Sequence, residues 1–143
     1  MAQTVICHLT SVHPVTDIRI FHKECRSLFE AGYEVHLVVC GGENLDIAGI
    51  QIHAAMGHVN GRLQRFTKAL WAIAHKALEI DADIYHFHDP ELIAVALYLR
   101  FKGKKVIYDV HEDYPKQVLT KEWISPILRR LVAVCIDVVE SSC

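Results

Sequence analysis

Two clusters of His, Asp and Glu residues each follow a short apolar run. The first cluster spans His86 to Glu91 after the run 84–87, and the second spans His111 to Asp113 after the run 106–110. Imidazole and carboxylate groups can exchange protons, accept hydrogen bonds from hydroxyl groups or hold a metal ion. Residues 91–102 between the runs have a helical pattern that Gly103 closes, which predicts a right-handed strand–helix–strand unit with parallel strands. Ligands of such sheets bind beyond the carboxyl ends of the strands, so we expect any chemistry of this protein there.

The first cluster raises the question of a metal ion. His86 and His88 are two residues apart on a strand and point to one face, where with Asp89 they could hold zinc. The His-x-His-x-Asp-His pattern of metallo-hydrolases is not met, because Pro90 and Glu91 occupy its last two positions. Other His or Cys residues do not lie at short ligand spacing, so we expect no metal. A metal-free binding edge and a polar strand end without a ligand remain as alternatives.

Part of this cluster is also a helix start. Asp89 can cap the helix, Pro90 suits its first turn, and Glu91 favours its positive end. His88 has no such structural explanation. It lies where an imidazole and backbone N–H groups could meet a hydroxyl or phosphate oxygen.

The second cluster places His111, Glu112 and Asp113 directly after an apolar strand. A loop needs one or two polar residues, whereas this loop has three ionisable ones, including a group that titrates near neutral pH. We interpret these residues as functional.

The start of the chain contributes to the same edge. Residues 4–9 read as a central buried strand, so the turn that contains His13 is expected to approach the two clusters. Thr16 or Asp17 can cap the helix that follows, whose apolar stripe runs from Ile18 to Phe29. Arg19 could bind a phosphate or carboxylate with its planar fork, or form a surface ion pair.

The remaining pattern completes an α/β, Rossmann-like, mostly parallel sheet with helices on both faces. We expect further strands at 34–40 and 47–54, a long helix at 62–80 and a last helix beginning near Ser125. The first turn lacks the G-x-G-x-x-G fingerprint of dinucleotide binding. Because the chain stops at Cys143 in or just past an apolar helix, we expect a cut in a longer protein.

The helix at 62–80 carries a basic face with an aromatic residue. Arg65, Lys68 and Trp71 lie away from its apolar stripe. A Trp beside basic residues on an exposed helix resembles an interfacial anchor for an anionic membrane. The alternative is a solvated basic face with Trp71 partly tucked against a neighbour.

Composition narrows the class of protein. The chain has 143 residues, 52% of them hydrophobic, and a formal net charge of −2, which indicates one globular domain and argues against nucleic-acid binding. Five cysteines without a CxxC motif predict buried thiols in a reducing compartment. The sequence shows no signal peptide and no apolar run that could span a membrane, so we expect a cytoplasmic protein.

Three motifs, at residues 11–24, 86–92 and 108–115, together resemble the amino-terminal domain of bacterial family 4 (group 1) glycosyltransferases. They read Ser-Val-His-Pro-Val-Thr-Asp-Ile-Arg-Ile-Phe-His-Lys-Glu, His-Phe-His-Asp-Pro-Glu-Leu and Tyr-Asp-Val-His-Glu-Asp-Tyr-Pro. The resemblance implies the GT-B architecture, in which two Rossmann-like domains enclose the active site. It implies transfer from a nucleotide-sugar donor to a glycan or lipid-linked acceptor, with retention of configuration and without metal or other cofactor.

The resemblance also implies roles for individual residues. His111 matches the histidine that contacts the donor sugar near the reaction centre. Glu112 and Asp113, which the polar run after the strand indicates, are expected to bind substrate beside it. The matches on the acceptor side of the cleft are His13, Asp17, Arg19, His88, Asp89 and Glu91. Many members carry a Gly-Gly pair near the donor diphosphate, where this chain has Val12, His13 and Pro14.

The Glu-x₇-Glu pattern of the donor site has no place within residues 1–143. We therefore expect one acceptor-side domain, inactive alone, whose donor-binding domain is missing from this chain. The alternative is a stand-alone Rossmann-like or flavodoxin-like module that binds an anion or a protein. A second alternative is a metallo-hydrolase that uses His86, His88 and Asp89.

Overall fold

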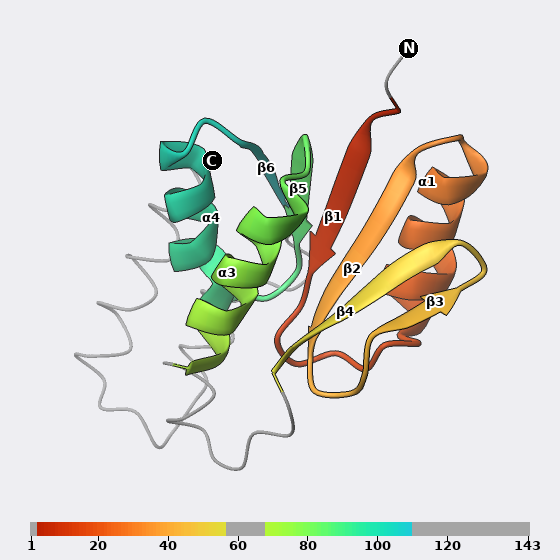
Figure 1. The fold of residues 1–143 in the computed structure, drawn as a ribbon, viewed down its shortest axis with the longest axis horizontal. Helices are drawn as coiled ribbons and strands as arrows, with labels where there is room; N and C mark the ends of the chain where they lie inside the picture. Colours follow the sequence, from red (N-terminus) through yellow and green to blue (C-terminus); the bar gives the residue numbers. More distant parts are fainter. Residues whose placement is uncertain (1–2, 57–67, 110–143) are drawn as a thin grey trace, which may run out of the picture. The chain divides into compact units, whose positions relative to one another are not determined.

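The computed structural model describes residues 3–56 and 68–109. Residues 1–107 form one compact unit and residues 108–143 a second, and the fold below is that of the first (Figure 1). The strands are β1 (Val5–Leu9), β2 (Glu34–Cys40), β3 (Leu45–Ile47), β4 (Ile50–Met56), β5 (Ile84–Phe87) and β6 (Lys105–Tyr108). The helices are η1 (Ile18–Cys25), α1 (Arg26–Glu30), α3 (Leu70–Ile80), η3 (Pro90–Leu92) and α4 (Ile93–Phe101).

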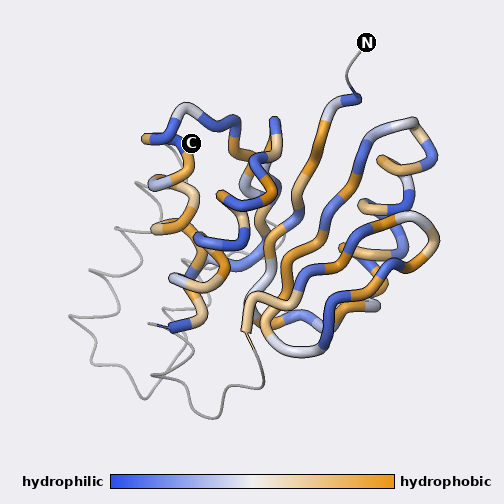
Figure 2. Tube along the Cα trace, viewed as in Figure 1, coloured by the Kyte–Doolittle hydropathy of each residue, from blue (hydrophilic) through white to orange (hydrophobic). Residues whose placement is uncertain are grey.

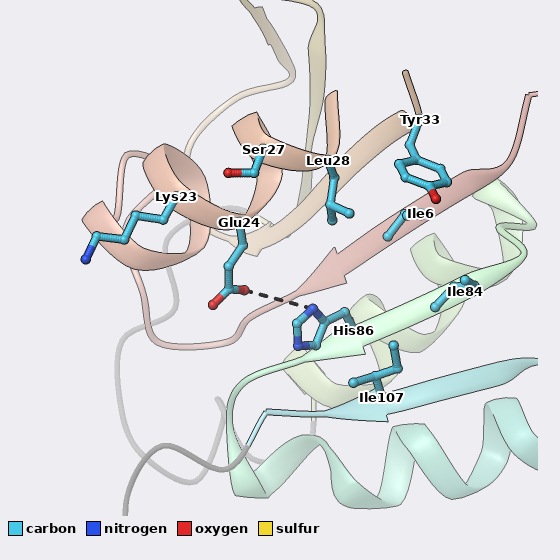
Figure 3. Close-up of a pocket in the computed structure, with 9 residues that line it drawn as sticks. All are labelled: Ile6, Lys23, Glu24, Ser27, Leu28, Tyr33, Ile84, His86 and Ile107. Atoms are coloured by element: carbon cyan, nitrogen blue, oxygen red, sulfur yellow. Dashed lines mark ion pairs between the residues drawn. The ribbon is translucent and has the colours of Figure 1, made fainter. Parts of the chain in front are cut away.

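The described strands form one six-stranded sheet in the order β3-β4-β2-β1-β5-β6. β1 pairs in parallel with both β2 and β5, and β2 pairs in parallel with β4. β3 is antiparallel to β4, whereas the arrow of β6 points the same way as those of β1 and β5 in Figure 3. The predicted α/β class, the mostly parallel sheet and the central position of β1 are confirmed.

Helices cover both faces of this sheet, which explains the apolar strands. The tube in Figure 2 is mostly orange through β1 and β2, as expected for strands buried on both faces. α3 packs across β1, β2 and β4 on one face, and η1 and α1 pack on β2 on the other. The core under η1 consists of Ile20, Phe21, Cys25, Val35, Leu37, Val39, Ile50 and Ile52.

The buried Tyr85 fixes β5 to the helix before it. Its hydroxyl group donates a hydrogen bond of 2.7 Å to the carbonyl oxygen of Ala77 in α3 and accepts one of 2.9 Å from the N–H of Ala82. Burial raises the pKa of Tyr85 to about 12. The phenol therefore stays neutral and holds the end of α3 against β5.

The segment predicted as one strand at 47–54 is instead a β-hairpin, so that prediction was wrong. β3 and β4 meet at Ala48 and Gly49, whose φ angles are 55° and 84°. The side chain of Asp46 accepts a hydrogen bond of 3.0 Å from the N–H of Gly49, and the ring of Phe29 occupies the space where a Cβ would lie. The turn suits two left-handed residues, but Ala-Gly is a weaker sequence signal for it than Asn-Gly.

The first helix begins as predicted at Asp17. Its carboxylate accepts hydrogen bonds of 2.9 Å from the N–H groups of Arg19 and Ile20. Phe21 and Cys25 are buried, but Ile18 is 71% exposed, so its place in the apolar stripe was wrong. η1 is wound as a π-helix, whose wider turn changes the spacing of side chains that share a face.

The described parts of the other predicted helices agree with the sequence pattern. α3 ends at Ile80 and is followed by Asp81, whose backbone is left-handed with φ 53°. The helix expected at 91–102 is η3 followed by α4, and it is closed by Gly103 with φ 83°. Of the cysteines described, Cys7 and Cys25 are buried free thiols as predicted, and Cys40 is half-buried.

We expect Asp17→Ala to lower the free energy of unfolding by about 1 kcal/mol at neutral pH, because two backbone N–H groups lose their acceptor. Asp17→Asn retains a capping oxygen and should lose only a few tenths of a kcal/mol. Urea denaturation of both variants measures the difference.

This effect should depend on pH. Partial burial acts to raise the pKa of Asp17, but the N–H groups of Ile20 and Arg19 and the imidazole of His13 outweigh it and lower the pKa below 3.8. The carboxylate therefore stabilises the fold above that pH, and its contribution disappears as the pH falls through the folded-state pKa. The stabilities of the native chain and Asp17→Ala should converge in acid, and a constant difference would contradict the assignment.

Candidate functional site at the carboxyl edge of the sheet

The carboxyl ends of β1 and β5 lie side by side. Leu9, the last residue of β1, pairs with Phe87, the last residue of β5. The segment that begins at Thr10 therefore leaves the sheet next to the segment that begins at His88. This confirms that the polar residues after both strands share one edge.

Asp89 is the centre of a polar network at this edge. Its Oδ2 accepts hydrogen bonds of 2.7 Å from the hydroxyl group of Thr10 and 2.7 Å from the N–H of Ser11, and it lies 3.2 Å from the Ser11 hydroxyl oxygen. Asp89 is only 2% exposed, so these donors replace the water that a carboxylate needs. The hydrogen bonds from Thr10 and Ser11 lock the loop after β1 to the loop after β5.

The expectation that the Asp89 side chain caps the following helix was wrong. The side chain makes no capping hydrogen bond to η3, and the backbone carbonyl oxygen of Asp89 accepts the 2.9 Å hydrogen bond from the N–H of Leu92 instead. The donors on the β1 loop take the carboxylate because they lie beside it in the parallel register. The neighbouring Glu91 adds a further link, accepting a hydrogen bond of 2.6 Å from the Ser11 hydroxyl group.

His13 connects this network to the first helix. Its Nε2 lies 3.4 Å from Oδ1 of Asp89 and its Nδ1 lies 3.5 Å from Oδ2 of Asp17. The N–H of His13 also donates to the Thr10 hydroxyl group at 3.2 Å. His13 is 30% exposed, so its imidazole is an accessible group on a buried polar support. The structure thus brings four predicted residues together: His13, Asp17, Asp89 and Glu91.

Arg19 lies near this network but is engaged elsewhere. Its Nε donates a hydrogen bond of 3.2 Å to Oε1 of Glu24, five residues later in η1. Of the two interpretations of Arg19, the ion pair is the one that the structure contains.

His88 does not take part in the Asp89 network. Its imidazole is fully buried and stacks on His8 of β1, with ring centroids 5.4 Å apart, so its expected contact with a substrate oxygen at the edge was wrong. His86 lies 4.7 Å from both rings, and Glu24 approaches from η1. The prediction that His86 and His88 share a face is confirmed, whereas the partners His8 and Glu24 were missed.

The group of His8, Glu24, His86 and His88 is called the histidine cluster below. Burial first, and then the neighbouring His86 and His88, lower the pKa of His8 well below its ordinary value. Its Nε2 is buried and has no hydrogen-bond partner within the part of the chain that the structure describes. Asp89 binds the β1 loop and not this cluster, so the trio His86, His88 and Asp89 proposed for a metallo-hydrolase is not assembled.

The other predicted residues divide into two groups. Lys68 lies just before α3, and Trp71 lies in its first turn. Trp71 is 74% exposed, which confirms that it lies off the buried stripe of Ile73 and Ala77. The described helices include none that is long and apolar enough to cross a membrane. Four of the predicted site residues lie outside the described ranges: Arg65, His111, Glu112 and Asp113.

The fold defines a domain of the Rossmann-like α/β class, with a cluster of polar side chains at the carboxyl edge of its sheet, where ligands of such sheets bind. Comparison with family models then identifies the chain: residues 19–139 match the model of Glycosyltransferase Family 4. The chain belongs to this family, so the predicted resemblance to family 4 glycosyltransferases is confirmed. A comparison with curated proteins found no match.

A solved structure of sucrose-phosphate synthase from Thermosynechococcus elongatus is similar, with a TM-score of 0.63 and 14% sequence identity. The alignment covers 94% of this chain and 40% of that chain. At this identity the likeness concerns the fold alone. The present chain spans less than half of the length of that protein.

We expect Asp89→Asn to lower the free energy of unfolding by about 1.5–3 kcal/mol, because hydrogen bonds to a buried charge are lost or weakened. Glu91→Gln is the matched control, since this half-buried carboxylate accepts one hydroxyl group and its loss should cost about 1 kcal/mol or less. Urea denaturation compares the two variants. Equal losses would show that Asp89 is not the centre of the network.

Proposed function

We propose that this chain is the acceptor-side domain of a retaining glycosyltransferase of GT-B architecture, whose donor-binding domain lies outside residues 1–143. Membership of glycosyltransferase family 4 supports the class of reaction. The observation that carries the proposal is the Asp89 network, which builds a rigid polar rim where ligands of parallel sheets bind. The substrates would be a nucleotide sugar and a glycan or lipid-linked acceptor.

In this proposal His13 and Glu91 hold the acceptor hydroxyl group. Both side chains are partly exposed, and both are oriented by buried partners, Asp89 for His13 and Ser11 for Glu91. A hydroxyl group bound between an imidazole and a carboxylate is fixed in direction. Part of the entropy that the reactants must lose to reach the transition state is then already lost when the acceptor binds. Asp17 keeps the imidazole of His13 in place from the other side.

His111 is proposed to form a hydrogen bond with the donor sugar near the reaction centre. The charge that develops on the departing nucleotide diphosphate would be met by groups of the donor-binding domain. Neither role requires a metal ion at the reaction centre. The domain described here would contribute orientation and proximity, so residues 1–143 alone are not expected to turn over.

We expect His111→Ala in the intact enzyme to lower kcat by about 100-fold or more, since it removes a hydrogen bond at the developing charge. His13→Gln should chiefly raise KM for the acceptor. Initial rates of nucleotide diphosphate release, measured with a panel of nucleotide sugars, separate the two effects, and NMR of the product reports the anomeric configuration.

His75→Ala is the control for this experiment, because His75 is exposed on α3 and pairs with Glu79, 3.1 Å away and one turn later on the same helix. Unchanged rates in His111→Ala would remove the role of His111. The transferase proposal would be contradicted if the intact enzyme, with acceptor extracts present, released nucleotide diphosphate from none of the nucleotide sugars.

We also propose that the exposed start of α3 holds the enzyme at the cytoplasmic face of an anionic membrane, near a lipid-linked acceptor. The support is the high exposure of Trp71 and the neighbouring Lys68, which together offer an aromatic and a cationic group to an interface. Arg65 would extend this basic face.

The double variant Lys68→Ala/Trp71→Ala should sediment about tenfold less with anionic vesicles, because one charge and one interfacial ring are lost. Leu45→Ala is the control: Leu45 is 46% exposed on β3 beside the acidic Asp46. Sedimentation with phosphatidylglycerol vesicles, compared with phosphatidylcholine vesicles, measures binding. The membrane proposal fails if the intact protein does not sediment or if the double variant binds as well as the native protein.

A further inference from the structure

The histidine cluster joins three separate elements of the fold. His8 comes from β1, His86 and His88 come from β5 and the residue just after it, and Glu24 comes from η1. His8 and His86 are paired in the parallel register, so their side chains stand next to each other on the face that η1 covers. The ring centroids of all three histidines lie within 5.4 Å of one another.

The nitrogen and oxygen atoms of the cluster converge on one point. Nδ1 of His8 and Nε2 of His88 are 3.1 Å apart, and Oε2 of Glu24 lies 3.5 Å from Nε2 of His88. The same oxygen lies 3.8 Å from Nδ1 of His8 and 3.9 Å from Nδ1 of His86. One donor atom from each of the four residues lies within 4.8 Å of all the others.

These separations are close to those of a metal centre. An ion with tetrahedral bonds of about 2.0–2.1 Å to nitrogen and oxygen separates its donor atoms by roughly 3.3 Å. Small rotations of His86 and Glu24, the two partly exposed members, would bring the wider pairs to that value. Three imidazoles and one carboxylate are donors that Zn²⁺ prefers.

The surroundings of Glu24 support this geometry. Nε of Arg19 holds Oε1 of Glu24 at 3.2 Å, while Oε2 faces the three histidines. A partner that fixes the orientation of a ligand from outside is typical of metal sites. Arg19 would therefore be a positioning residue for Glu24.

An ion could reach the cluster from a groove of about 620 Å³, which Glu24 and His86 both line. Figure 3 shows the ion pair between them at the wall of this groove, with the ammonium group of Lys23 directed away from it. His8 and His88 lie deeper and are fully buried. The site thus has two accessible ligands and two buried ones.

We propose that His8, Glu24, His86 and His88 bind a structural divalent transition metal ion, with Zn²⁺ as the best fit. Four protein ligands leave no coordination position for a substrate, so the ion would brace β1, β5 and η1 beneath the Asp89 network and take no part in transfer. The proposal does not rest on the glycosyltransferase assignment. The expectation of no metal considered ligands at short spacing only, whereas His8 and Glu24 are distant in sequence.

The test is titration of the intact, tag-free protein with Zn²⁺ after treatment with EDTA, using a chromophoric chelator as competitor. One ion per chain should bind, and its binding should raise Tm. Co²⁺ in its place should give the intense visible bands of tetrahedral coordination. Glu24→Gln and His86→Ala each change one of the two accessible ligands and leave the buried His8 and His88 intact. Each variant should bind Zn²⁺ about 100-fold more weakly or worse.

Graded and control variants make the result specific. Arg19→Ala should weaken binding by about 10–100-fold and leave the Tm of the metal-free protein unchanged. His53→Ala is the matched control, because His53 belongs to another imidazole pair, 2.9 Å from His36, and should bind Zn²⁺ as the native protein does. Absence of a stoichiometric ion, or equal affinity in the native protein, Glu24→Gln and His86→Ala, would overturn the proposal.

Discussion

The parallel pairing of β1 with β5 is the constraint on which the polar part of this domain depends. It places the residues after Leu9 next to the residues after Phe87, so two loops that are about eighty residues apart in sequence form one edge. A shift of this register by one residue would turn each side chain of β5 to the opposite face. The Asp89 network and the histidine cluster would then both be lost.

The consecutive residues His88 and Asp89 belong to different polar groups, the histidine cluster and the Asp89 network, because their side chains point to different sides. His88 enters the cluster under η1, whereas Asp89 receives the hydroxyl and N–H groups of the β1 loop. Both groups depend on β1, an inner strand of the sheet: His8 lies in this strand, and Thr10 and Ser11 follow it directly. A change in the position of β1 would therefore disturb both.

The sequence predicts the parts of the fold that depend on local pattern. β2 and β5 have the predicted bounds because short, predominantly apolar runs mark buried parallel strands. The β3–β4 hairpin was missed because Ala48 is an unusual residue at a left-handed position. The partners His8 and Glu24 could not be found from spacing, since only the register of β1 with β5 and the packing of η1 bring them to His88. Glu24 as the ion-pair partner of Arg19 was missed for a similar reason, because this pair depends on the π-helical winding of η1, which places residues five apart near each other.

The hairpin also forms one of the two edges of the described sheet. An exposed strand edge is a template for pairing with another chain, and natural proteins protect such edges with short strands and charged residues. β3 has three residues, carries Asp46 at its middle and runs against the direction of its neighbour. Its short length and the charge at its middle therefore protect this edge of the sheet from pairing with another strand. Among the described strands, β6 is left as the edge where a further parallel strand can pair.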